Sequence, residues 1–156
     1  MKPEHSRSKR VVIVTGFAVI STIVGAAAQA HVEASPTKVK AGTVAVISFN
    51  VPHGCAGSPT TKLAIKIPTG LANATAVAKK GWTSSVAGGV ITFAGGSIPP
   101  KTVSIFKIKA TTPTAATTLV FPTIQTCAKG ETAWIEASPV GKPEPDHPAP
   151  SVRVVK

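Results

Sequence analysis

Residues 44–51 read Val-Ala-Val-Ile-Ser-Phe-Asn-Val and alternate between two faces. One face carries Ala45, Ile47, Phe49 and Val51, and the other carries Val44, Val46, Ser48 and Asn50. Residues 62–67 repeat the pattern, with Leu63, Ile65 and Ile67 on an apolar face and Lys62, Ala64 and Lys66 on the other. A period of two is typical of a strand with one buried face. Both stretches therefore predict half-buried β-strands.

Shorter runs of the same kind extend along the rest of the chain. They lie at 31–36, 90–93, 103–109, 117–121, 132–136 and 151–155. Turn signals separate them at Lys-Ala-Gly 40–42, Pro-Thr-Gly 68–70, Gly88-Gly89, Gly95-Gly96, Pro99-Pro100 and Lys129-Gly130. No helical period is visible after residue 30. Short strands with Gly and Pro turns predict an all-β, antiparallel β-sandwich. We expect one domain over 31–156, with Pro-rich residues 139–150 as an extended connection before the last strand.

Residues 1–30 have the three parts of a secretory signal peptide. A basic start (Lys2, Arg7, Lys9 and Arg10) precedes an apolar stretch from Val11 to about Ala28, and Ala-Gln-Ala at 28–30 forms a cleavage site. An uncleaved anchor is the alternative, because the apolar stretch approaches the length of a membrane span. We favour cleavage after Ala30, which predicts a periplasmic or secreted protein with no stable membrane anchor.

Charge argues against a nucleic-acid partner. Removing four basic residues and Glu4 with the signal peptide lowers the formal net charge from +11 to +8. The remaining basic residues are scattered, and the chain has no Tyr and only two Trp. Nucleic-acid binding usually needs a basic stripe with aromatic side chains for stacking. We therefore expect the charge to confer solubility and weak attraction to anionic envelope surfaces.

Two cysteines, Cys55 and Cys127, lie in the exported part. An even count in an oxidising compartment favours a disulfide. It would close a loop of roughly 70 residues and stabilise the fold by about 4 kcal/mol on the chain-entropy account. Two free thiols or a thiolate metal site are the alternatives.

Cleavage after Ala30 would make His31 the first residue of the mature chain. An N-terminal His offers an α-amine and an imidazole Nδ1 to one metal ion. Such a chelate suits Cu(II), which favours nitrogen donors in a tetragonal plane. The alternative is that His31 stands at the junction by chance, or that cleavage occurs one or two residues away.

Three further residues could complete a metal site. An antiparallel hairpin would place residue 31 opposite roughly residue 50, which brings His53 near His31. The alternative for His53 is a loop side chain that faces water. Glu136 is a candidate oxygen ligand on the same strand face as Trp134, which could form a wall of the site. The alternative there is a core Trp with a surface acid nearby.

Other residues and chemistries fit the sequence less well. We expect His147 to be solvated in the Pro-rich segment and Trp82 to lie in the core. A blue-copper site needs a free Cys and often a Met, but the only Met is Met1. The only Asp, Asp146, stands beside His147, and no Ser-His-Asp triad or glycosidase pair is legible. We therefore do not expect an enzyme.

Several motifs follow one another along the chain: His-Val-x-x-Ser-Pro at 31–36, Val-Pro-His-Gly-Cys-x-Gly-Ser-Pro-Thr-Thr-Lys at 51–62, Ile-Pro-x-Gly at 67–70, Gly-Trp at 81–82, Phe-Pro-x-x-Gln-x-Cys at 121–127 and Trp-Ile-Glu at 134–136. Together they resemble the YcnI-like family of exported bacterial copper-binding domains. The resemblance implies a cupredoxin-like β-sandwich that holds Cu(II) by one N-terminal His, a monohistidine brace, assisted by carboxylates near a Trp. His31 matches the brace, Trp134 matches the site Trp, and Glu136 follows it.

The chain departs from that family at two places. Relatives often carry an acid directly after the first Cys, where Ala56 stands here, and an acidic pair before a Phe, where Ser104 and Ile105 stand here. We therefore expect weaker copper binding, or binding through His53 or Glu136 instead.

The functional expectation is a copper chaperone or buffer whose partners are the copper ion and other envelope copper proteins. One alternative is a structural or adhesive envelope module without metal. Another is an oxidative enzyme of the polysaccharide monooxygenase type, which needs a second well-placed His and a flat aromatic surface.

Overall fold

The computed structural model describes residues 31–156, and this part of the chain is built from strands alone. The predicted signal peptide, 1–30, lies outside the described residues. Within 31–156 no helix is long and apolar enough to cross a membrane. The all-β prediction is therefore confirmed.

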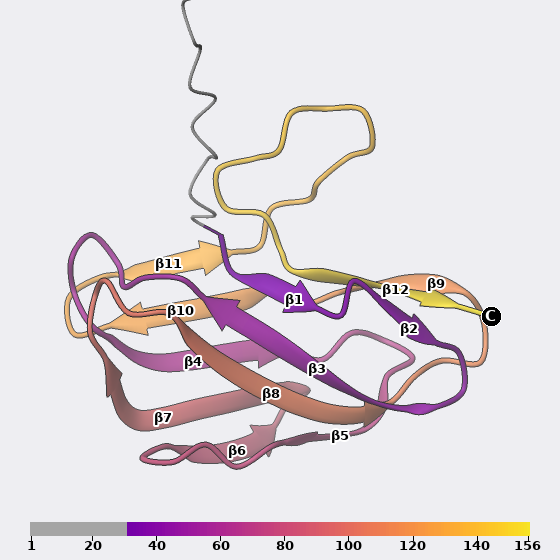
Figure 1. Ribbon diagram of the computed structural model, residues 1–156, viewed down its shortest axis with the longest axis horizontal. Coiled ribbons are helices and arrows are strands. Elements are labelled where there is room, and N and C mark those ends of the chain that lie inside the picture. The colour runs from indigo at the N-terminus through magenta and orange to yellow at the C-terminus, as the bar shows by residue number, and fades with distance from the viewer. Residues whose placement is uncertain (1–30) are drawn as a thin grey trace, which may run out of the picture.

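The strands form two main sheets and one small sheet (Figure 1). The four-stranded sheet has the order β1 (Glu33–Ser35), β3 (Val44–Val51), β8 (Ser104–Thr111) and β5 (Ala72–Ala76). The five-stranded sheet has the order β11 (Glu131–Trp134), β10 (Thr123–Cys127), β4 (Thr60–Lys66), β7 (Val90–Ile98) and β6 (Thr83–Ala87). The small sheet joins β2 (Lys38–Lys40), β12 (Ser151–Val155) and β9 (Thr117–Val120). Pairing is antiparallel except between β2 and β12, which run parallel.

The apolar faces predicted from the sequence form the core. Ile47, Phe49 and Val51 of β3 are buried, as are Leu63 and Ile65 of β4. Residues from both main sheets belong to one buried cluster, so the sheets pack face to face as a sandwich. Each buried side chain of this size contributes roughly 1.5–3 kcal/mol. The alternation in two strands was therefore sufficient to indicate which side of each faces the core.

The Gly95-Gly96 turn is a wrong prediction, because both residues lie inside β7. Gly95 adopts a positive φ of 83°, whereas Gly96 allows close approach, because a Cβ there would lie 2.1 Å from the indole of Trp82. Trp82 is half-buried and packs edge-on against Phe106, with ring centroids 4.9 Å apart. A glycine within a strand can make room for an aromatic ring, and from the sequence alone it is indistinguishable from a turn glycine.

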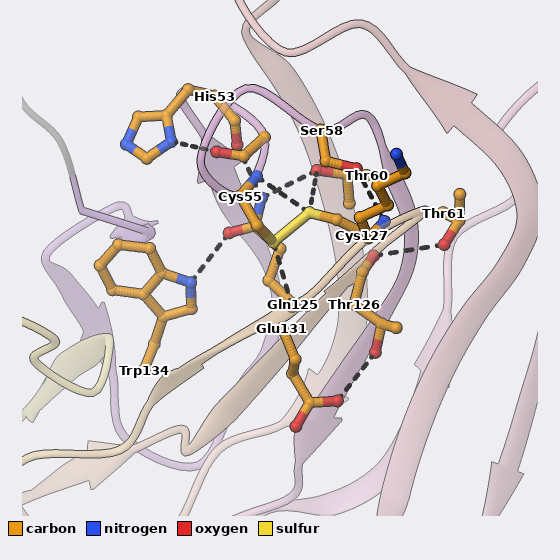
Figure 2. The surroundings of a disulfide bond; sticks show 12 residues. His53, Cys55, Ser58, Thr60, Thr61, Gln125, Thr126, Cys127, Glu131 and Trp134 are labelled. Carbon is orange, nitrogen blue, oxygen red and sulfur yellow. Dashed lines mark hydrogen bonds between the residues drawn. A yellow bond between two sulfur atoms is a disulfide. The ribbon is translucent and has the colours of Figure 1, made fainter.

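A disulfide joins Cys55 to Cys127, with Cα atoms 5.9 Å apart (Figure 2). It connects the loop after β3 to the end of β10 across a sequence separation of 72 residues. The described part of the chain contains no free cysteine. The predicted pairing is confirmed, and it fixes the loop that carries His53.

Candidate metal centre

Trp134, the last residue of β11, is surrounded by three imidazoles. Its ring centroid lies 5.9 Å from that of His31, 6.5 Å from that of His53 and 5.3 Å from that of His147. These histidines come from three separate segments: the chain before β1, the loop after β3 and the 139–150 loop. Trp134 is only 3% exposed, so it belongs to the buried core and also contacts the three histidines.

A buried glutamine fixes the position of the Trp134 ring. Gln125 on β10 is 1% exposed, and its Oε1 accepts a hydrogen bond of 2.9 Å from Trp134 Nε1. Its Nε2 donates to the carbonyl of His53 at 2.6 Å and to Thr60 Oγ1 at 2.8 Å (Figure 2). One side chain thus satisfies polar groups on three strands or loops and holds the His53 loop against the indole.

The expected antiparallel pairing before His53 is present, but the expected short turn is wrong, because β2 lies between β1 and β3 and belongs to the small sheet. β1 pairs with β3 so that Glu33 faces Asn50, and continuing this register puts residue 31 opposite residue 52. The His31 side chain is 23% exposed, and its Nδ1 lies 3.4 Å from Oε1 of Glu144. The ring nitrogen that a brace requires therefore faces a carboxylate, although no feature of the sequence pointed to Glu144.

His53 is half-buried and does not simply face water. Its Nδ1 lies 2.7 Å from the carbonyl oxygen of Gly54. A carbonyl can only accept, so Nδ1 is the donor and the neutral ring carries its lone pair on Nε2. His53 and His31 both lie near the Trp134 ring, and their ligation of one metal ion stays a prediction.

Glu136 is used differently from the arrangement expected. β11 ends at Trp134, and Glu136 lies beyond it, exposed, in an isolated bridge with Pro148. Glu136 Oε2 accepts a hydrogen bond of 2.6 Å from the backbone N–H of His147, and its own N–H donates to the His147 carbonyl at 3.0 Å. Glu136 thus anchors the 139–150 loop, and its ligation of copper stays a prediction.

The 139–150 loop is more than an extended connection. It rises beside the point where the described chain begins and returns to β12 (Figure 1). His147 is exposed, as expected, but its ring packs against Trp134. A pocket of about 300 Å³ lies between the loop and β1. Its lining is His31, Val32, Glu33, Ala34, Thr37, Ser138, Glu144, Pro148, Ala149, Pro150 and Ser151.

This pocket is electrostatically distinct from the rest of the protein. It contains two carboxylates, from Glu33 and Glu144, and no Lys or Arg, although residues 31–156 carry a formal charge of +8. Within residues 31–156, no three His, Cys, Asp or Glu side chains are grouped so as to hold a metal ion. The side chains of this centre alone therefore fall short of a complete ligand set.

The two departures from the family motifs offer no replacement ligand. Ala56 and Ile105 are both exposed and supply no side-chain oxygen, and half-buried Ser104 supplies a neutral hydroxyl in place of a carboxylate. At Ile105 the carbonyl oxygen accepts a hydrogen bond of 3.0 Å from Lys79 Nζ. Desolvation lowers the pKa of Lys79, and its ammonium lies 4.8 Å from the centroid of the Phe106 ring. A cation already present there disfavours a metal ion at that position.

The described residues form a β-sandwich with one disulfide and three histidines around Trp134, and a comparison with solved structures supports this fold. The chain is similar to a solved structure, an uncharacterized protein from Nocardia farcinica described as having an immunoglobulin-like fold. The two share 24% identity with a TM-score of 0.71, over 81% of this chain and 99% of that one. An immunoglobulin-like fold is likewise a sandwich of two antiparallel sheets.

The chain belongs to the family described as Domain of unknown function (DUF1775), which it matches over residues 31–90 and 86–154. This is the YcnI-like family that the sequence motifs indicated. No curated protein matches the chain in sequence.

Proposed function

We propose that the mature protein begins at His31 and binds one Cu(II) through the α-amine and Nδ1 of that residue. The observation that carries this proposal is the pocket beside His31 Nδ1, which holds two carboxylates and no cationic side chain in an otherwise basic protein. In such surroundings a metal cation is attracted and an anion is repelled.

The donor chemistry fits copper when the chain terminus is included. The α-amine is a backbone donor, so it adds to the ligands without requiring a third clustered side chain. Nitrogen donors from the amine and the imidazole match the preference of Cu(II). Trp134 would form an apolar wall behind His31, and His53 would lie on the same wall. Glu136 would act by fixing the loop.

The same geometry favours a carrier or buffer over an enzyme. The His31 side chain is 23% exposed and that of Glu144 is 65% exposed, so a bound ion would remain within reach of another protein. The expected partners are the copper ion and other envelope copper proteins, met in the periplasm or outside the cell. Copper is the ion that the protein carries, and it would pass to a partner protein by ligand exchange at this exposed site.

Mass spectrometry of the exported N-terminus, followed by Cu(II) titration of that species, tests the proposal. We expect a chain that starts at His31 and binds one Cu(II), and a His31→Ala variant that does not bind it specifically. His147→Ala is the matched control, because it removes another imidazole from the same indole. Equal binding by wild type and His31→Ala would refute the proposal, and reductant-dependent peroxide release on a polysaccharide would instead indicate an enzyme.

A further inference from the structure

We infer that Glu144 is the carboxylate ligand of the copper site, supplied by the Pro-rich 139–150 loop. This assignment rests on the proposed function, and it replaces the oxygen donors missing at Ala56 and Ile105. The structural basis is the approach of Glu144 Oε1 to His31 Nδ1, the ring nitrogen that the brace uses.

The distance between these two atoms suits a shared metal ion. Donor atoms bound to one ion at about 2.0–2.1 Å each lie roughly 2.9 Å apart when adjacent and about 4.1 Å apart when opposite. The observed separation of 3.4 Å exceeds the spacing of adjacent donors by about 0.5 Å. Both groups would therefore need only a small adjustment to hold one ion between them.

Among the described residues, Glu144 contacts the His31 imidazole and no Lys or Arg side chain. Within residues 31–156, the only ion pair joins Glu144 to His31, although thirteen Lys and Arg side chains are present there. An exposed pair of this kind stabilises a fold by about 0–1 kcal/mol at most. The contact therefore contributes little to folding, which is consistent with a role in binding.

The loop constrains the backbone around Glu144 before any ion arrives. Pro143 and Pro145 flank it, and each proline ring fixes its backbone φ. Lys142 N–H donates to the carbonyl of Pro139 at 3.2 Å, which closes a turn just before the Pro-Glu-Pro segment. After that segment, Glu136 holds His147 by both its backbone and its carboxylate. The backbone that carries Glu144 therefore loses little conformational freedom on binding, and the exposed carboxylate itself remains to be ordered by the ion.

Glu33 provides a matched control. It lines the same pocket and carries the same charge, but it belongs to β1, where it pairs with Asn50. Glu33→Gln and Glu144→Gln therefore remove equal charge from one pocket. Only Glu144→Gln removes the oxygen that faces His31 Nδ1. General attraction between charges is screened by salt, with a Debye length of about 3 Å at 1 M, whereas a ligand bond is not.

The experiment uses chains that begin at His31: wild type, Glu144→Gln, Glu33→Gln and His31→Ala. Cu(II) affinity is measured by chelator competition at low salt and at 1 M salt, and electron paramagnetic resonance spectra are recorded. We expect Glu144→Gln to lower affinity about tenfold or more at both salt concentrations, by analogy with the 10–100-fold losses seen even for groups that support metal ligands. Its spectrum should change, because one oxygen donor is lost. Glu33→Gln should have a small effect that disappears at 1 M salt.

Two results would overturn the assignment while leaving the proposed function intact. In one, Glu144→Gln retains the affinity and spectrum of wild type while His31→Ala loses binding. In the other, Glu144→Gln and Glu33→Gln cause equal losses that both vanish at high salt. If His31→Ala binds as tightly as wild type, the proposed function itself fails. Thermal unfolding of the copper-free variants guards against misfolding, and Glu144→Gln should match wild type closely.

Discussion

Replacing Gln125 by Leu should destabilise the protein severely, because one buried amide serves three polar partners. The substitution leaves the Trp134 N–H and the His53 carbonyl without their side-chain partner, and Thr60 Oγ1 keeps only its contact with Cys127 Sγ at 3.8 Å. An unsatisfied buried group costs about 1–3 kcal/mol. Counting the indole N–H in full and the other two groups in part gives a loss of roughly 3–4 kcal/mol.

Urea and thermal unfolding measure this loss directly. For a domain of this size, each kcal/mol lost from the free energy of unfolding lowers Tm by roughly 3–4 °C, so Tm should fall by about 10–15 °C. Thr126→Val is the matched control on the next residue, because its hydroxyl makes only an exposed bond to Glu131 at 3.2 Å. The control should lie within about 0.5 kcal/mol of wild type. A loss below about 1 kcal/mol for Gln125→Leu would refute the view that this amide holds the site together.

Three other predictions follow from particular contacts. Replacing Cys55 and Cys127 by Ala should lower the free energy of unfolding by about 4 kcal/mol, measured by urea denaturation, because the disulfide closes a long loop; an unchanged midpoint would contradict this. Gly96→Ala should destabilise the protein by about 1–3 kcal/mol because its methyl group would overlap the Trp82 ring, and an unchanged Tm would show that the ring moves freely. Cu(II) should quench the fluorescence of Trp134, so Trp134→Phe should abolish most of the quenching; quenching that survives would place the ion elsewhere.

The strands with a clean two-residue period could be predicted from the sequence, and the others could not. Residues 44–51 coincide with β3, and 151–155 coincide with β12. β5 and β6 were missed because Ala, Asn, Ser and Thr dominate them and both are largely exposed at sheet edges. β10 was also missed, although it is central, because its buried positions include the polar Thr123 and Gln125.

The candidate site was predictable only where it follows from strand pairing. The register of β1 and β3 placed His31 near His53, and both lie against Trp134. Nothing local predicted that the 139–150 loop folds back over this end, because the backbone bonds that hold it form with Glu136. Glu144 is an ordinary acid between two prolines until that contact is known. The contact of Glu144 with His31 depends on how the loop folds, and it produces no periodic pattern in the sequence.

The most direct test of the copper site compares two purified proteins that differ only at the N-terminus, one beginning at His31 and one at Gln29. In the longer chain the amine of His31 becomes a peptide nitrogen, which is a far poorer donor, while the imidazole, Glu144 and Trp134 are unchanged. We expect the His31 protein to bind one Cu(II) tightly, with a nitrogen-rich electron paramagnetic resonance spectrum, and the Gln29 protein to bind it much more weakly. Equal affinity and identical spectra for the two proteins would contradict binding through the α-amine of His31.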